Sequence, residues 1–436
     1  MNLHRLLRAR AGAGRPVRVV LIGAGKFGSM FLAQVPDTPG LEIAGIADLD
    51  PARAREACRA VGWDDARIGA TRFVDDAAAL IGRDDVEVVV EATGNPAAGI
   101  AHARAAIAAG RHIVMVNVEA DVLAGPLLAA EARAAGVVYS LAYGDQPALT
   151  AELVDWARAT GFRVVAAGKG TRYLPLYHAV TPDDVWTHYG LTPEQARQAG
   201  MNPQMFNSFL DGTKSAIEMV AIANATGLDV PAQGLLFPPC GVDDLPHVLR
   251  PRAAGGVLDH AGMAEVVSSL ERDGRPVFRD LRWGVYVVVE APGDYAAACF
   301  AQYGMKTDAS GRYAALYRPY HMIGLELGIS VLSAALRGEP TGQPQEFRGD
   351  VAAVAKRALR EGETLDGEGG YTVWGRALPA ATSLALGALP IGLAHRMRLH
   401  RDVAEGEVVL WQDVAPAGND PLLAAAIEAR RTLERR

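Results

Sequence analysis

The chain has 436 residues, with 43 lysines and arginines against 50 aspartates and glutamates, which gives a formal net charge of −7. At roughly 100–200 residues per domain, this length predicts two to four domains. A slightly acidic chain without a basic block argues against nucleic acid or an anionic membrane surface as the main partner. Half of the residues are hydrophobic, so a large core is available and wholesale disorder is excluded.

The cysteines and the termini narrow the class further. Cys58, Cys240 and Cys299 lie far apart and form no CxxC pattern, which argues against a disulfide scaffold or a structural zinc site and fits a reducing cytosol. The basic start of the chain lacks the apolar run of a signal peptide. The weakly polar stretch 377–394 contains prolines and glycines, so we expect buried strands and turns there rather than a membrane helix. We expect a cytoplasmic protein.

The first 150 residues alternate apolar runs with helical sequence, such as the helix expected over Ser29–Val35. The runs are rich in β-branched residues, as strands buried on both faces require. Alternating strands and helices predict an α/β fold with a doubly wound, parallel sheet of the Rossmann type. The expected strands are Val17–Ile22, Leu41–Ala47, Val86–Val90, His112–Asn117 and Val137–Ser140.

A glycine-rich turn lies between the first strand and the first helix of this region. It has the form G-x-G-x-x-G, and an acidic residue ends the next strand, which is the sequence context of a dinucleotide-binding motif. The first glycine would make the tight turn, the second would admit the pyrophosphate, and the third would let helix and strand pack closely. The predicted cofactor-binding residues of this turn are Gly23, Gly25, Lys26, Phe27 and Gly28.

The choice between NAD and NADP stays open on these residues. Asp48, at the end of the second strand, would ordinarily bind the ribose 2′-hydroxyl and repel a 2′-phosphate. Arg53 and Arg55 follow shortly after it and could instead hold that phosphate.

Further candidates end the next two strands. Ligands of open α/β sheets bind at the carboxyl ends of the strands, so we expect Thr93, Gly94 and Asn117 to lie along the cofactor. Glu119 follows on the same edge and is a candidate for a substrate hydroxyl or a metal ion. The alternative is an ordinary solvated carboxylate.

A mixed α+β region, extending to about residue 340, carries the predicted catalytic residues. Lys169 follows a short strand in a Gly-Lys-Gly sequence, and Asn207–Gly227 is expected to be one helix on which Asp211 and Lys214 share a face with Glu218. A lysine can polarise a carbonyl group or transfer a proton when burial lowers its pKa. We predict that Lys169, Asp211 and Lys214 are catalytic; the alternatives are a solvent-exposed turn lysine and an exposed ion pair.

Basic and aromatic residues of the same region suit an anionic substrate group. Lys306 precedes the segment Tyr317-Arg318-Pro319-Tyr320-His321, and such groups bind phosphate or carboxylate. We therefore predict substrate-binding roles for Arg172, Lys306, Arg318 and His321.

The last hundred residues contain an internal repeat. The segment 355–365 aligns with 399–409 at a constant offset, since 405 − 361 and 406 − 362 both give 44, and both segments contain Glu-Gly-Glu. The repeat predicts a small β-domain with two similar tight turns, unless the similarity is due to chance.

Taken together, these motifs resemble a known family. The stretches VRVVLIGAGKFGSMFLAQVPDTPGLEIAGIADLD, VVVEATGNP, YGDQPAL, GKGTRY, FLDGTKSAIEMVAIANATGL and YRPYHMIGLE resemble the 1-deoxy-D-xylulose 5-phosphate reductoisomerase-like oxidoreductases, which are related to homoserine dehydrogenases. The tail, with GETLDGEGGYTVWG and LHRDVAEGEVVLWQDV, is similar to a SAF-type β-domain.

The resemblance implies three domains: a Rossmann domain over 1–150, a catalytic and dimerisation α+β domain over 151–340, and a SAF-like β-domain over 341–436. It implies a homodimer that converts a sugar phosphate, 1-deoxy-D-xylulose 5-phosphate, to 2-C-methyl-D-erythritol 4-phosphate with NADPH, NADH being the alternative. Mg²⁺ or Mn²⁺ would be a further cofactor. Two other functions stay open: a dehydrogenase of another sugar, polyol or semialdehyde without rearrangement, and a non-catalytic nucleotide sensor or sugar-binding protein.

Overall fold

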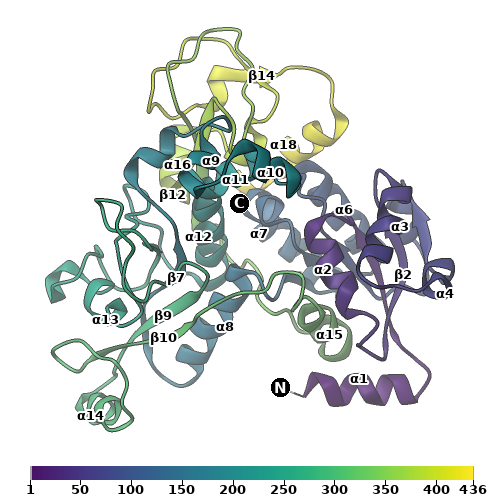
Figure 1. Cartoon of the computed structure of the whole chain (residues 1–436), viewed down its shortest axis with the longest axis horizontal. Helices are drawn as coiled ribbons and strands as arrows, with labels where there is room; N and C mark the ends of the chain where they lie inside the picture. The colour runs from purple at the N-terminus through teal and green to yellow at the C-terminus, as the bar shows by residue number, and fades with distance from the viewer. Residues whose placement is uncertain (1, 436) are drawn as a thin grey trace. The chain divides into compact units, whose positions relative to one another are not determined.

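The structure, a computed structural model, describes residues 2–435 (Figure 1). The chain forms two compact units, and it passes between them more than once. Unit 1 contains the residues up to Leu149, His321–Gln345, and the residues from Pro421 onward, whereas unit 2 contains Thr150–Tyr320 and Glu346–Asp420. No helix within residues 2–435 is both long enough and apolar enough to cross a membrane.

Unit 1 contains a six-stranded parallel sheet in the order β3-β2-β1-β4-β5-β6. The order reverses direction between β1 and β4, which is the switch point of a doubly wound sheet. This confirms the predicted fold class, and the first two strands have the expected bounds. The strands are β1 (Val17–Ile22), β2 (Leu41–Ala47), β3 (Arg72–Val74), β4 (Val88–Glu91), β5 (His112–Met115) and β6 (Tyr139–Leu141).

Helices cover both faces of this sheet. One face shares its core with α1, α2, α3 and α15, and the other face packs against α5, α6 and α7. The helices are α1 (Leu3–Gly12), α2 (Lys26–Gln34), α3 (Pro51–Ala60), α4 (Asp65–Ala70), α5 (Ala78–Ile81), α6 (Pro96–Ala108), α7 (Val118–Ala134), α15 (Gly328–Arg337) and α18 (Pro421–Glu434).

Two distant segments complete unit 1. Helix α15 packs against β1, β4, β5 and β6, and buries Val331 in the same core as β1. Helix α18, at the end of the chain, packs on α6 and α7. A Rossmann unit bounded by residue 150 is therefore incomplete without two helices that begin 178 and 271 residues later, since 328 − 150 gives 178 and 421 − 150 gives 271.

Unit 2 contains a four-stranded mixed sheet in the order β10-β9-β7-β8 and two short hairpins. Strand β7 pairs with β8 in parallel and with β9 antiparallel. The strands are β7 (Arg163–Thr171), β8 (Met263–Ser268), β9 (Val285–Glu290), β10 (Tyr313–Arg318), β11 (Gly349–Ala355), β12 (Val373–Pro379), β13 (Met397–Leu399) and β14 (Val414–Pro416).

The helices of unit 2 begin with α8 (Gln146–Ala159), which spans the boundary between the units. The others are α9 (Val185–Tyr189), α10 (Pro193–Gln198), α11 (Pro203–Leu210), α12 (Thr213–Thr226), α13 (Leu245–Val248), α14 (Asp294–Gln302), α16 (Ala380–Leu386) and α17 (Ile391–Ala394), with the 3₁₀ turn η1 at Pro175–Ala179.

Helix α12 is the centre of unit 2 (Figure 1). It packs against β7 and β8 and also against the hairpin β11–β12, so nearly all its residues are buried. Asn224 fixes the hairpin to the helix, because its side-chain oxygen accepts hydrogen bonds from the backbone N–H groups of Arg348 and Gly349 at 2.8 and 2.9 Å. Residues 346–420 therefore pack into unit 2 instead of forming the separate third domain expected over 341–436.

The two repeated turns of the tail have the same hydrogen bonds. Glu363 pairs with Arg357 at 2.8 Å and accepts the backbone N–H three residues before it at 2.8 Å. Glu407 pairs with Arg401 at 2.7 Å and likewise accepts the N–H three residues before it, at 3.0 Å. Since 401 − 357 and 407 − 363 both give 44, the sequence repeat is also a structural one.

Two local expectations were wrong. The stretch 377–394, expected as strands and turns, contains α16 and α17 after the end of β12. The helix expected over Asn207–Gly227 is two helices, because Gly212, with φ of +90°, separates α11 from α12.

Candidate functional site

The glycine-rich loop of unit 1 has little space for side chains at two positions and open space at the third. A Cβ on Gly23 would lie 2.6 Å from the carbonyl oxygen of Ala92, and one on Gly28 would lie 2.3 Å from that of Gly23. A Cβ on Gly25 would meet nothing within 4 Å. Because Gly25 directly precedes α2, the first amides of that helix adjoin open space, where an anion is favoured. These residues fit a dinucleotide pyrophosphate.

Asp48 is held in place from several directions. It accepts hydrogen bonds from the backbone N–H groups of Ala24 at 2.9 Å and Asp50 at 3.0 Å, and from Arg53 at 2.8 Å. Burial alone would raise the pKa of Asp48, but these bonds outweigh burial and hold its pKa below the ordinary value. The Arg53 side chain is 64% exposed, so its guanidinium group can also contact a ligand.

The ends of β4 and β5 are tied together by buried polar groups. The Thr93 hydroxyl donates to the fully buried Glu91 at 2.6 Å, and His102 lies 3.2 Å from the same oxygen. Asn117 caps α7 and donates to the carbonyl of Asn95 at 2.9 Å. The amide group of Asn117 is therefore engaged in holding the loop.

A buried ion pair lies on the central strand of unit 2. Lys169 belongs to β7, and its ammonium group contacts the carboxylate of Glu218 on α12; their side chains are only 5% and 4% exposed. Added Cβ atoms on Gly168 and Gly170 would each lie 1.9 Å from a backbone carbonyl oxygen. The two glycines therefore allow neighbouring segments to approach the strand closely around Lys169, which is not in a turn.

Asp211 does not share a helix with Lys214, contrary to the expectation. It ends α11, is fully buried, and forms an ion pair of 2.8 Å with Lys356, a residue of the C-terminal segment that the sequence did not single out. Lys356 also donates to the carbonyl oxygens of Val180 and Gly370, each at 2.8 Å. Lys214 lies in the first turn of α12 and is the one residue of that helix that is not buried.

Arg172 has a neighbour of the same charge. Burial lowers the pKa of Arg282, and the positive charge of Arg172 lowers it further. Within residues 2–435 neither guanidinium group forms an ion pair, and the buried Nε of Arg172 has no hydrogen-bond partner. Two adjacent, partly buried arginines that form no ion pair favour an anionic ligand, although the charge of Asp280 also acts on Arg282.

The remaining predicted residues do not gather in one place. Glu119 lies in the first turn of α7 in unit 1. Lys306 is exposed after α14, and Arg318 ends β10, both in unit 2, whereas His321 begins the segment that returns to unit 1. In the described part of the chain, no three His, Cys, Asp or Glu residues are close enough together to hold a metal ion.

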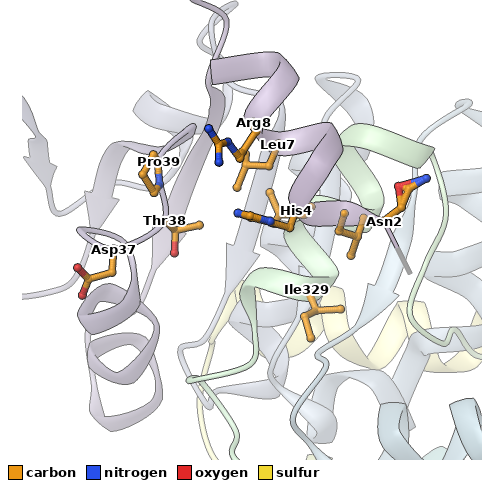
Figure 2. Close-up of a pocket in the computed structure, with 10 residues that line it drawn as sticks. Asn2, His4, Leu7, Arg8, Asp37, Thr38, Pro39 and Ile329 are labelled. Atoms are coloured by element: carbon orange, nitrogen blue, oxygen red, sulfur yellow. The ribbon is translucent and has the colours of Figure 1, made fainter. Parts of the chain in front are cut away.

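A pocket of about 620 Å³ opens elsewhere in unit 1 (Figure 2). Leu7 of α1 and Ile329 of α15 contribute apolar surface to it, and His4 and Arg8 of α1 also line it. None of the residues of the glycine-rich loop lines it, so this pocket is distinct from the predicted nucleotide site.

Three residues of unit 2 that the sequence did not single out lie close to the predicted site residues or their neighbours. Lys356 and Arg282 lie far along the chain from the residues they approach, and no local motif marks them. His178, whose partners are described below, lies five residues after Tyr173, and only this proximity to the Gly-Lys-Gly strand could have suggested it.

Two family models match consecutive parts of the chain. The model of the GFO/IDH/MocA oxidoreductase family, described as an NAD-binding Rossmann fold, matches residues 17–116. The model described as the catalytic domain of the oxidoreductase DRL matches residues 144–327. These matches indicate an NAD(P)-dependent oxidoreductase, in which residues 17–116 resemble the NAD-binding domain of the GFO/IDH/MocA type and residues 144–327 resemble the DRL catalytic domain.

Solved structures resemble the chain only distantly. One is biliverdin reductase from Synechocystis sp. PCC 6803 in complex with biliverdin and NADP⁺, with 19% identity over 36% of this chain and 48% of that chain and a TM-score of 0.27. A 3-ketoreductase from Actinomadura kijaniata in complex with NADP has 21% identity over 36% and 50%, with a TM-score of 0.26. The matched part thus spans about half the length of these two chains.

A probable dehydrogenase from Thermotoga maritima is matched over more of its length. It has 15% identity over 74% of this chain and 90% of that chain, with a TM-score of 0.38. No curated protein sequence matches the chain.

Proposed function

We propose that the chain is an NADPH-dependent reductase of a phosphorylated keto sugar, and that its reaction converts 1-deoxy-D-xylulose 5-phosphate to 2-C-methyl-D-erythritol 4-phosphate. The observation that carries this proposal is the buried pair of Lys169 and Glu218 on β7 and α12. Burying two charges costs more free energy than their attraction commonly returns. Such a pair in a domain of the DRL type is therefore best explained by chemistry.

The side chains of unit 2 can act on a ketose. The Lys169 ammonium group donates a hydrogen bond to the substrate carbonyl oxygen and stabilises the negative charge that develops on it. Glu218 holds the lysine in position and accepts or returns a proton. Arg172 and Arg282, which form no ion pair in the described part of the chain, bind the phosphate group. The branched product requires that one carbon–carbon bond of the substrate breaks and another forms, which gives an aldehyde. The nicotinamide cofactor, when bound, would supply the hydride that reduces this aldehyde.

The cofactor preference rests on Arg53. Its guanidinium group neutralises Asp48, which would otherwise repel a 2′-phosphate, and it is exposed enough to contact that phosphate. This arrangement supports NADPH over NADH as the proposed cofactor.

The direct test is absorbance at the nicotinamide band with NADPH, Mg²⁺ and 1-deoxy-D-xylulose 5-phosphate, repeated with NADH. We expect NADPH to be oxidised and the product to have a branched carbon chain by NMR. Oxidation that gives an unbranched product would replace the reductoisomerase by a simple reductase. Tight NADPH binding without turnover on this substrate or other ketose phosphates would contradict the proposed reaction.

Lys214 provides a second test of the same site. Replacing it with alanine should lower kcat by about 10- to 100-fold if its ammonium group contacts the substrate. The affinity for NADPH, measured by fluorescence titration, should stay within about twofold, because Lys214 belongs to unit 2. Unchanged turnover would remove Lys214 from the site.

A further inference from the structure

Tyr173 and His178 form a hydrogen-bonded pair just after β7. The Tyr173 hydroxyl lies 2.9 Å from Nε2 of His178, and Nδ1 of His178 lies 2.7 Å from the backbone carbonyl oxygen of Asp211. A carbonyl oxygen only accepts hydrogen bonds, so Nδ1 must carry the imidazole proton. Nε2 of the neutral ring is then the acceptor, and the Tyr173 hydroxyl donates to it.

Aromatic rings enclose the pair. The His178 ring stacks on Trp374 of β12 with 3.8 Å between centroids, and the Tyr173 ring stacks on Phe237, also at 3.8 Å. A Cβ on Gly212 would lie 3.1 Å from Cε1 of His178, so a glycine leaves room for the imidazole at the junction of α11 and α12. Segments from three other parts of the chain thus surround the two rings.

The backbone at Phe237 is strained to support this arrangement. Phe237 has φ of +50°, in the left-handed region that non-glycine residues seldom adopt. The fully buried carboxylate of Glu265 holds the segment, since it accepts the backbone N–H groups of Leu236 at 3.1 Å and Phe237 at 3.4 Å. Backbone strain of this kind concentrates at functional sites, which separates this pair from an ordinary packing contact.

The pair also lies near the proposed catalytic lysine along the chain. Lys169 lies within β7, and Tyr173 follows the end of that strand by two residues. Lys169 reaches Glu218 within α12, and Tyr173 reaches, through His178, the residue two positions before α12. Both groups therefore contact the segment that contains the end of α11 and helix α12.

We propose that Tyr173 and His178 form a proton relay for a substrate hydroxyl group. The hydroxyl proton passes to the Tyr173 oxygen while the Tyr173 proton passes to Nε2 of His178, and the reverse transfer returns a proton to the substrate alkoxide. Neither proton transfer oxidises or reduces any group. This inference rests on the proposed function, in which one proton must leave a hydroxyl group and another must reach the reduced oxygen, so that two acid–base groups are useful.

The charges around the relay suit a short-lived imidazolium cation. Burial lowers the pKa of His178, and the positive charges of Lys356 and Arg376 oppose protonation as well, although the Asp211 carbonyl and charge favour it. Burial also raises the pKa of Tyr173, against the effect of Arg272 over its ring. The resting pair is thus neutral, and a proton accepted by His178 is readily returned.

The first test needs no turnover. The ¹⁵N chemical shifts of His178 in the full-length protein, assigned by comparison with His178→Asn, report which ring nitrogen carries the proton. We expect the Nδ1–H form at neutral pH and a shift of the Nε2 resonance in Tyr173→Phe. A proton on Nε2 would overturn the relay whatever the enzyme's substrate.

The second test measures turnover of the ketose phosphate with NADPH. Tyr173→Phe should lower kcat by about 100-fold with KM within about threefold, whereas Tyr371→Phe removes a hydroxyl that binds Asp183 elsewhere in unit 2 and should leave kcat unchanged. His178→Asn keeps a donor for the Asp211 carbonyl but has no group that titrates, so the acid limb of the pH profile should disappear. Wild-type turnover with an unaffected Tyr173→Phe would overturn the relay, whereas no wild-type turnover would contradict the proposed function itself.

Discussion

Asp121 is a single residue whose burial has a measurable effect. It lies on α7 with no exposed surface; one carboxylate oxygen accepts the Tyr139 hydroxyl at 2.8 Å, and the other has no hydrogen-bond partner. Burial raises the pKa of Asp121 to about 7, and the bond from Tyr139 offsets only part of this. From the ordinary value of 3.8 to about 7, the folded protein keeps a proton that the unfolded chain releases. The free energy of unfolding therefore falls as the pH rises through this window.

Asp121→Asn should remove this dependence. The amide oxygen can still accept the Tyr139 hydroxyl, and no charge is buried at high pH. At pH 8 we expect the variant to be more stable than the wild type by a few kcal/mol, since one pKa unit corresponds to about 1.4 kcal/mol. The gain should vanish near pH 4. Thermal melts over this range measure it, with exposed Asp37→Asn as the control; equal stability of variant and wild type at pH 8 would show that Asp121 is not strained by burial.

The stability of unit 2 should depend on the buried ion pair of Asp211 and Lys356, so that removing one partner costs more than removing both. Replacing Asp211 with asparagine leaves the Lys356 charge buried and should destabilise unit 2 by about 3–5 kcal/mol. Lys356→Met alone leaves the Asp211 carboxylate without its partner, but the double variant leaves no charge and should recover much of the loss. Urea unfolding, followed by hydrogen exchange in unit 2, measures the three variants. Additive losses in the double variant would contradict direct pairing.

At the scale of elements, two glycines of the glycine-rich loop have different roles, one in helix packing and one in the space for a ligand. Gly28 has no room for a Cβ, because helix α2 approaches the loop there, whereas Gly25 adjoins open space. We therefore expect folding to depend on Gly28 and ligand binding to depend on Gly25, although both belong to the same motif.

Gly28→Ala and Gly25→Ala should consequently differ. The first should lower the Tm of unit 1, because a methyl group would overlap the Gly23 carbonyl oxygen, and should weaken NADPH binding only as a result. The second should keep the Tm within about 2 °C and weaken NADPH binding by at least tenfold, because the methyl group occupies the space of the pyrophosphate. Differential scanning fluorimetry and fluorescence titration separate the effects. Equal Tm losses in both variants would contradict this division.

The elements that the sequence predicted well are those with a local signal. The β-branched runs gave β1 and β2 their bounds, and the repeated Glu-Gly-Glu segments gave two matching turns. Gly212 could have marked the break before α12, but glycine within a helical pattern is common enough to be read as tolerated. The partners of Asp211 and Arg172 could not be predicted, because Lys356 and Arg282 approach them only through tertiary packing.

At the scale of the whole molecule, domain boundaries were the least predictable feature. Residues 321–345 and 421–435 return to unit 1 with helices that carry no motif, and only their packing shows to which unit they belong. Dividing the sequence into consecutive domains assigned α15 to the catalytic domain and α18 to the tail. Hydrophobic periodicity can identify a helix, but it does not show which other elements that helix packs against.

Removing residues 421–436 should therefore affect the start of the chain rather than the neighbouring tail. Ala426, Ala429 and Leu433 of α18 are buried, and the helix packs on α6 and α7. We expect faster hydrogen exchange in α6 and α7 and unchanged exchange in β11 and β12. Leu433→Ala, which deletes less surface, should give the same pattern more weakly. Increased exchange confined to β11 and β12 would place α18 with unit 2 instead.

The late return of α15 also has a consequence for biosynthesis. All strands of the parallel sheet have been synthesised once β6 is complete. Helix α15 (Gly328–Arg337), which covers part of one face of the sheet together with α1, α2 and α3, follows 187 residues later, since 328 − 141 gives 187. At a synthesis rate of about 5–20 residues per second, the part of this apolar face that contacts α15 stays exposed for roughly 10–40 s. A nascent chain with a sheet in that state is a natural client for a holding chaperone, and its yield on expression should depend on translation speed through the second half of the message.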